Sequence, residues 1–308
     1  MSSTQAVETM KECLSVIEVD SPEVQEKALQ TLASLTRVSP QNRSFVAQTE
    51  GAIPTLASLT NAASPIIQTL SLLILFNLSL NPDLKHSLAD MQTIDYLNSH
   101  ITSPSSPDSS KLASSLICSL AMLDKNKAKL GVSGTVELLV KAITISLSTS
   151  PHTDSHHLLS CLAELVHFHG NSTLAVRAGA VPVLLQVVET SDSEDVAATS
   201  LAVLGSVVRF NEGLSALKNS EKVVNCMSQV LRRRSLLCKE GAAEILLRLF
   251  DESEECVKEA LMLPDFSTLL ADLSVRGSVR VREKADLLMK MITHFNLALE
   301  GKGTTFFV

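Results

Sequence analysis

The chain repeats itself at intervals of 41 to 45 residues, and this periodicity limits its possible folds more than any other feature. The string Gly51-Ala52-Ile53-Pro54-x-Leu56 recurs as Gly179-Ala180-Val181-Pro182-x-Leu184. A repeat of this length cannot bury its own apolar face, whereas stacked neighbours bury a continuous core. The period therefore predicts a solenoid. Its apolar anchor positions are Met10, Ile53, Ile94, Val136, Val181, Val223 and Phe266.

Each repeat is predicted to contain a first helix, a short polar loop and a longer second helix. Leu and Ala recur in the second segment at i, i+3, i+4 and i+7, which is the period of a helix. Pro22 and Pro65 stand where a helix start tolerates proline. Short linking helices, such as 42–48 and 84–90, are expected to lead into the next repeat. The second helices are predicted at 23–36, 66–79, 110–123, 156–167, 196–208, 238–250 and 281–294.

These patterns predict one solenoid over residues 1–298, followed by a flexible C-terminal tail at 299–308. The first and last repeats should act as caps, because each lacks one neighbour. The repeats are predicted at about 8–50, 51–91, 92–133, 134–178, 179–220, 221–263 and 264–298.

The composition favours aliphatic helix packing and argues against a nucleic-acid partner. Hydrophobic residues make up 45% of the chain, but aromatic residues only 3%, with no Trp and one Tyr. Such a core suits close-packed helices better than an aromatic-lined ligand pocket. The net charge is −7, whereas phosphate binding needs clustered excess Lys and Arg. We therefore expect neither nucleic acid nor a cofactor.

Cysteine usage and hydropathy favour a reducing compartment, the cytoplasm or the nucleus. None of the six cysteines forms a C-x-x-C pair, and Cys118, Cys161 and Cys226 lie among apolar residues, so we expect these three to be buried. The first ten residues lack the pattern of a secretory signal. The longest apolar stretch, at 70–80, is interrupted by polar residues and is too short to insert into a membrane.

The repeat resembles the armadillo repeat, on its length, its Gly-Ala-Ile-Pro opening and its ending at Asn77-Leu78-Ser79. HEAT repeats are the near alternative, and the Gly-Ala-(Ile/Val)-Pro openings favour armadillo. The resemblance implies a right-handed all-α solenoid of about seven repeats. Two strings, at 239–247 and 280–288, look like the C-terminal repeats of plant U-box armadillo proteins. Those proteins are ubiquitin ligases whose U-box recruits the conjugating enzyme. Because few residues precede the first repeat here, we expect no U-box in this chain.

The resemblance also implies where a protein partner would bind, because armadillo second helices line a concave groove. The position of Asn77 is expected to face that groove, as in the Asn ladder of importin-type arrays. Only Asn77 matches that ladder and Trp is absent, so an importin-like role is disfavoured, and so is a uniformly basic groove like that of β-catenin. The aligned column reads Ser34, Asn77, Ser119, Glu164, Ser206, Arg248 and Lys290. One turn earlier it reads Gln30, Leu73, Ser115, Ser160, Ala202, Glu244 and Asp286.

These two columns predict a polar, Ser-rich groove that becomes charged at its C-terminal end. Asn offers both a donor and an acceptor, so Asn77 could hold the backbone of an extended segment or helix. The alternative is that the Ser residues are ordinary solvated helix surface. Glu244 with Arg248, and Asp286 with Lys290, stand at i, i+4 and could form ion pairs on their helices.

The sequence contains no motif that predicts catalysis or metal binding. It contains no G-x-S-x-G, no H-E-x-x-H and no phosphate-binding Gly loop, so no catalytic residue is predicted. His157 and Cys161 stand at i, i+4, a spacing that can bind metal, but Cys161 falls on the expected core face, and no metal site is predicted. Ser103 and Ser106, each followed by Pro in a loop, and Ser235, after three Arg, are candidate phosphorylation sites.

The sequence thus predicts a non-enzymatic scaffold or adaptor that binds a protein partner in its groove, in plant signalling or ubiquitin-linked regulation by resemblance. The alternative is a substrate-recognition subunit of a U-box ubiquitin ligase that acts with a separate U-box protein.

Overall fold

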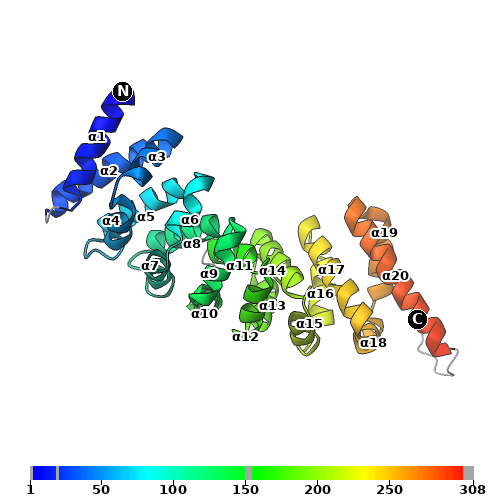
Figure 1. Ribbon diagram of the computed structural model, residues 1–308. Helices are drawn as coiled ribbons and strands as arrows, with labels where there is room; N and C mark the ends of the chain where they lie inside the picture. Colours follow the sequence, from blue (N-terminus) through cyan, green and yellow to red (C-terminus); the bar gives the residue numbers. More distant parts are fainter. Residues whose placement is uncertain (1–2, 19–20, 150–154, 301–308) are drawn as a thin grey trace. The chain divides into compact units, whose positions relative to one another are not determined.

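The computed structural model describes residues 3–18, 21–149 and 155–300, and over these residues it consists of helices and their connections, without a strand (Figure 1). The predicted fold class, an all-α solenoid, is confirmed. A first helix falls in each predicted repeat: α1 (Ser3–Val16), α4 (Ala52–Leu59), α7 (Met91–Thr102), α10 (Thr135–Thr149), α13 (Ala180–Thr190), α16 (Val223–Leu231) and α19 (Phe266–Arg276).

The second helices begin within three residues of their predicted starts. The proline expected at the start of the first two occupies the first turn of both. The last one continues to Glu300, so the predicted tail begins too early, and residues 301–308 lie outside the described residues. The seven are α2 (Pro22–Val38), α5 (Pro65–Ser79), α8 (Pro107–Ala121), α11 (His156–Leu165), α14 (Glu194–Val207), α17 (Leu236–Glu252) and α20 (Val279–Glu300).

Linking helices follow the second helices, as the two predicted examples indicated. They lead the chain back to the start of the next repeat. They are α3 (Pro40–Gln48), the 3₁₀ turn η1 (Pro82–Leu84) with α6 (Lys85–Leu88), α9 (Asp124–Val132), α12 (His169–Arg177), α15 (Asn211–Lys218) and α18 (Glu254–Met262).

The glycine of the Gly-Ala-(Ile/Val)-Pro opening is required by the backbone. Gly51, Gly134 and Gly179 have φ of +74°, +80° and +84°, in the left-handed region that favours glycine, just before a first helix. Lys222 and Asp265 take φ of 60° and 61° just before α16 and α19. The backbone turn therefore persists in the last two repeats, although the sequence motif does not.

The Ser-rich segment before α8 is an ordered helix start where the sequence suggests a loop. The Ser106 hydroxyl accepts a hydrogen bond from the backbone N–H of Ser109 at 3.1 Å. The Ser109 hydroxyl and the Ser106 backbone N–H are paired at 3.2 Å. This reciprocal capping box satisfies two N–H groups that the first helical turn would otherwise leave unpaired.

The core is aliphatic, as the composition predicts. All of the anchor side chains are buried except Ile53, which is half-buried. Cys161 and Cys226 are buried as expected, whereas Cys118 is only partly buried. No single described helix is long and apolar enough to cross a membrane, although three sharply bent helix pairs reach the required length and hydropathy together.

The helix contacts divide the chain into two compact bodies. The N-terminal body comprises Met1–Ala142 with Ser160–Asn171, and the C-terminal body comprises Ile143–Leu159 with Ser172–Val308. In the N-terminal body α2, α5 and α8 pack in succession, and in the C-terminal body α14, α17 and α20 do the same. The second helices therefore form one continuous row within each body (Figure 1).

Candidate functional site

Asn77, the residue expected to face a partner, is instead buried between second helices. Its side chain is 4% exposed, and its amide nitrogen donates hydrogen bonds to the Ala33 carbonyl and the Thr36 hydroxyl, both at 3.1 Å. Ala33 and Thr36 belong to α2, the preceding second helix. The expectation of an outward-facing Asn77 is therefore wrong, because its donors are used to join α5 to α2.

Ser119 is buried in the same manner, in contrast to Ser34. The Ser119 hydroxyl donates to the Ser79 carbonyl at 3.2 Å and accepts from the Ser79 hydroxyl at 2.9 Å. Lys85 donates from Nζ to the Ser119 carbonyl at 2.7 Å, and burial lowers the Lys85 pKa. Ser34 is exposed, but its hydroxyl donates within its own helix to Gln30. Ser119 is thus withdrawn from any partner, and Ser34 is not.

Glu164 is already occupied by an ion pair in the N-terminal body. The Lys127 Nζ lies 3.0 Å from the Glu164 carboxylate and 2.9 Å from that of Asp124. Burial opposes the charge of Lys127, but its hydrogen bonds to the two carboxylates outweigh that effect and raise the Lys127 pKa. A partner that used Glu164 would have to compete with a buried cation.

The column one turn earlier is the more open of the two predicted columns. Gln30, Ala202 and Asp286 are exposed, and Leu73, Ser115, Ser160 and Glu244 are half-buried. Residues three positions after the Asn77 column are exposed throughout: Arg37, Leu80, Met122, His167, Arg209, Asp251 and Thr293. At 100° per residue, the centre of the open face lies roughly 50° from the Asn77 column. The Asn77 column therefore lies at the edge of the open face of the second helices and not at its centre.

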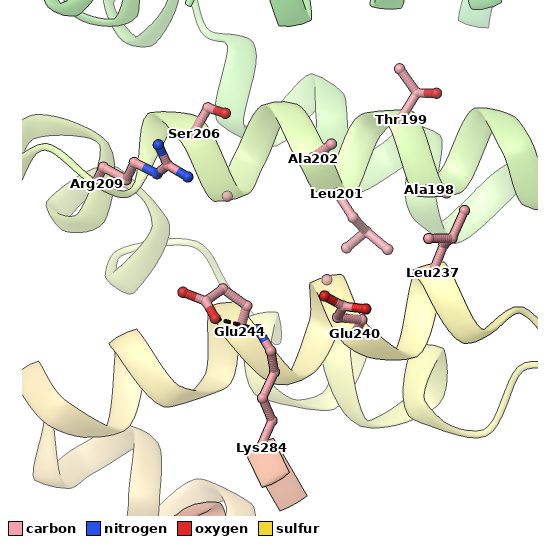
Figure 2. Close-up of a pocket in the computed structure, with 12 residues that line it drawn as sticks. Ala198, Thr199, Leu201, Ala202, Ser206, Arg209, Leu237, Glu240, Glu244 and Lys284 are labelled. Atoms are coloured by element: carbon pink, nitrogen blue, oxygen red, sulfur yellow. Dashed lines mark hydrogen bonds and ion pairs between the residues drawn. The ribbon is translucent and has the colours of Figure 1, made fainter. Parts of the chain in front are cut away.

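The C-terminal body has an open pocket of about 630 Å³ between α14 and α17, shown in Figure 2. The predicted residues Ser206 and Glu244 both line it, together with Ala202. The other lining residues, which the sequence pattern did not indicate, are Ala198, Thr199, Leu201, Gly205 and Arg209 from or just after α14, Leu237, Glu240 and Gly241 from α17, and Lys284 from α20.

Small residues keep the floor of this pocket low. Gly241 lies against Leu201, and a Cβ added at Gly241 would come within 3.0 Å of the Leu201 Cβ. Ala198, Ala202 and Gly205 line the α14 side. Because these positions project little side-chain volume, the space between the two helices stays open to an inserted side chain.

The acidic residues of the pocket are paired with cations from α17 and α20. Glu244 lies 2.6 Å from Lys284 Nζ and 3.4 Å from Arg248 Nε, and Glu240 lies 3.3 Å from Arg280. The hydrogen bond from Lys284 is the main reason that the Glu244 pKa is lowered. The predicted Glu244–Arg248 pair is thus confirmed, whereas Asp286 and Lys290 form no ion pair within the described part of α20.

Arg209 differs from the other pocket cations. It is exposed, and it makes no ion pair with any residue in the described ranges. Figure 2 shows Arg209 with Ser206 and Glu244 at one end of the pocket, and Leu237 with Thr199 at the other. Arg209 therefore marks one end of the pocket and Leu237 the other, and Glu240, which is paired with Arg280, lies between them.

A second, smaller hollow lies on α20 itself. It has a volume of about 480 Å³ and is lined by the predicted residues Asp286 and Lys290, together with Met289, Thr293, His294 and Leu297. Both predicted residues are exposed. All of its lining residues belong to α20, whereas the pocket between α14 and α17 is enclosed by two helices.

No metal-binding group emerges from the described residues. They contain no cluster of three or more His, Cys, Asp or Glu side chains placed to hold an ion. Cys161 is fully buried, and burial raises its pKa well above the ordinary value, which disfavours the thiolate that a metal would require.

An asparagine series does exist, but in the linking helices. Asn126 donates from its amide to the carbonyls of Leu120 and Lys85, both at 3.0 Å. Asn171 donates in the same way to Leu165 and Lys127. The spacing of 45 residues between Asn126 and Asn171 was visible in the sequence and was not recognised. These amides close helix ends and join repeats, so they are structural.

Comparison with known proteins agrees with this architecture. Residues 7–297 match the family model of the plant U-box protein ARM repeat region. The chain is similar to U-box domain-containing protein 8 of Arabidopsis thaliana, at 27% identity over 68% of this chain and 54% of that protein. It is also similar to U-box domain-containing protein 1 of Medicago truncatula, at 34% identity over 40% of this chain and 18% of that protein. The chain thus spans about half, or less, of the curated relatives it matches.

Two solved structures share the fold. An engineered protein superimposes with a TM-score of 0.79 at 18% identity, covering 92% of this chain and 68% of its own. A structure from a study of the phosphorylation switch between cadherin and beta-catenin also reaches 0.79, at 12% identity, covering 98% of this chain and 56% of its own. At these identities the likeness concerns the fold alone.

Proposed function

Because the chain belongs to the family defined by the armadillo-repeat region of plant U-box proteins, we propose that it is a non-enzymatic protein-binding module. A segment of the partner would lie along the exposed face of the second helices. The observation that carries this proposal is the open pocket between α14 and α17, where two helix faces enclose about 630 Å³. Binding energy at protein interfaces concentrates in such pockets, each filled by an anchoring side chain.

The surface that we assign to the partner excludes Asn77 and Ser119, which are buried in contacts between helices. It comprises the open column one turn earlier and the exposed residues three positions later. In the C-terminal body these are Ala202, Glu244 and Asp286, with Arg209, Asp251 and Thr293. A net charge of −7 further supports a protein rather than a nucleic acid as the partner.

Site-directed photocrosslinking tests this proposal. A photoreactive amino acid at position 202, on the pocket wall, should crosslink a protein that the same group at the exposed position 128, on α9, does not. The crosslinked protein is then identified, produced and titrated against the full chain. Ala202→Trp, which fills the pocket, should weaken binding at least tenfold, while Ala128→Trp should leave it unchanged. Equal binding by both variants would place the partner elsewhere.

A second candidate is a substrate-recognition subunit that acts with a separate U-box protein. It is favoured by the relatives, both of which are named as U-box domain-containing proteins. Incubated with ubiquitin, activating enzyme and conjugating enzyme, the chain alone should form no ubiquitin chains. If the second candidate is correct, adding a U-box protein should direct ubiquitin to the partner, and Ala202→Trp should abolish that transfer. Without such transfer, the simple adaptor is favoured.

We also propose the cytoplasm or nucleus as the site of action. The six cysteines are free, which suits a reducing compartment. A fluorescent fusion in plant cells tests this, and accumulation in the secretory pathway would contradict it.

A further inference from the structure

We infer that the α14–α17 pocket selects a protein segment that carries an apolar side chain and, three or four residues away, a carboxylate. This inference rests on the proposed function, because it specifies the chemistry of the partner at the same surface. Three features of the pocket carry it: an apolar end with an exposed leucine, a cation without an ion pair, and the separation of the two ends.

The apolar end is formed by Leu237, Leu201 and Ala198. Leu237 is 68% exposed at the start of α17, beside the pocket opening. Leu201 lies in the floor against Gly241. An aliphatic side chain placed here would remove the exposed surface of Leu237 from water, which is the main favourable term in such contacts. The low floor leaves depth for a branched side chain such as Leu, Ile or Val.

The charged end favours an anion. Glu240 and Glu244 are each held by a cation from α20, Arg280 and Lys284, so a basic side chain would have to displace an existing ion pair. With Arg248 and Arg209, the charged residues in and beside the pocket number four cations and two anions. Arg209 is the member of this set without an ion pair among the described residues, and its guanidinium matches a carboxylate in a two-pronged geometry.

The separation of the two ends sets the spacing of the motif. Leu201 and Arg209 are eight positions apart along α14 and its continuation, which corresponds to roughly 12 Å at the helical rise. An extended segment advances about 3.4 Å per residue. A carboxylate at Arg209 and an apolar group at Leu201 would therefore come from residues three or four positions apart.

Random dodecapeptides displayed on phage provide the probe, selected on the full chain and on three variants. The wild type should enrich peptides with an apolar residue three or four positions from Asp or Glu. Arg209→Glu should replace the acidic preference by a basic one, and Leu237→Ser should lose the apolar preference but keep the acidic one. Lys125→Glu is the matched control, since Lys125 is exposed on α9, outside the assigned partner surface, and it should select as the wild type does.

A synthetic peptide from the wild-type selection, titrated by fluorescence anisotropy, should bind Arg209→Glu at least tenfold more weakly than the wild type or Lys125→Glu. Enriched peptides without an acidic residue, or identical peptides on Arg209→Glu, would overturn this inference while leaving groove binding intact. If no peptide is enriched and position 202 crosslinks no protein, the proposed function itself fails.

Discussion

The two bodies join their second helices in different ways. In the N-terminal body, α2, α5 and α8 are connected by buried, uncharged side chains, through Asn77 and the Ser79–Ser119 pair. In the C-terminal body, α17 and α20 are connected by the ion pairs Glu244–Lys284 and Glu240–Arg280, whose members are 20% to 76% exposed. The same repeat thus offers two solutions to one packing problem.

The difference teaches how one array can separate stability from recognition. A buried amide without its partners costs much free energy, so Asn77 holds one arrangement firmly. Exposed ion pairs contribute little, since water and salt screen them. They nevertheless place charge on the outer face. We therefore expect the N-terminal row to govern stability and the C-terminal row to govern partner choice.

The largest effect should come from charges placed in the core of either body. Leu78 and Leu246 are fully buried in α5 and α17. Leu78→Asp or Leu246→Asp should lower the free energy of unfolding by roughly 3–5 kcal/mol, because each buries a charge without a partner. Urea titration followed by circular dichroism measures this loss. Leu80→Asp and Leu237→Asp, at exposed positions, are the controls and should change stability little.

Asn77→Ala should destabilise the protein by about 1–3 kcal/mol, since the Ala33 carbonyl and the Thr36 hydroxyl lose a buried donor. This is a change of stability rather than of binding. Thermal unfolding should show a lowered midpoint, and partner affinity at a temperature where the variant is folded should be unchanged. Ser34→Ala, at the exposed equivalent position on α2, is the control and should leave the unfolding midpoint unchanged. Equal midpoints for the two variants would show that the burial of Asn77 does not contribute to stability.

Glu244→Gln should cost less than about 1 kcal/mol, because the Glu244–Lys284 pair is partly exposed. The lowered pKa of Glu244 determines how the stabilisation by this ion pair depends on pH. The stabilisation is complete above the unfolded-state pKa of about 4.3 and is lost as the pH falls through the lower folded-state value. The wild-type advantage over Glu244→Gln should therefore vanish in acid and shrink in 1 M salt. A difference that persists under both conditions would contradict an electrostatic origin.

The smallest effect on stability should come from Arg209→Ala. Arg209 is exposed and makes no ion pair with the described residues, so its loss should shift the free energy of unfolding by no more than about 0.5 kcal/mol. Differential scanning calorimetry measures the shift. A substantial loss of stability would show that Arg209 helps to hold the helices together and is not simply an exposed residue of the binding surface.

The periodicity alone predicted the helix pairs and the core, because apolar spacing reports burial directly. It could not predict the outer face with the same certainty. Asn77 and Ser119 are polar, and a polar side chain on a helix looks solvent-exposed unless its partner is known. Their partners, Ala33 and Ser79, lie about 40 residues earlier and belong to another helix. Only the packing of successive repeats reveals them.

The pocket was accessible to sequence reasoning in part. Glu244 and Ser206 were on the predicted columns, and both line it. Leu237 and Arg209 were outside those columns, because an aligned column samples one position per helix while a pocket uses several turns of two helices. The closeness of Gly241 to Leu201 depends on the approach of two backbones, which no local pattern encodes.

The hydrogen bonds between repeats also bear on how the chain emerges from the ribosome. Asn77 donates a hydrogen bond to Ala33, which is synthesised before it. Lys85 donates to Ser119, which is synthesised 34 residues later. At roughly 5–20 residues per second, Ser119 is synthesised about 2–7 s after Lys85. Ser119 becomes available as an acceptor later still, once it has left the exit tunnel. During that interval the newest repeat exposes an apolar edge, and water solvates the Lys85 ammonium. Nascent-chain chaperones would therefore meet one incomplete repeat after another, always at the growing end.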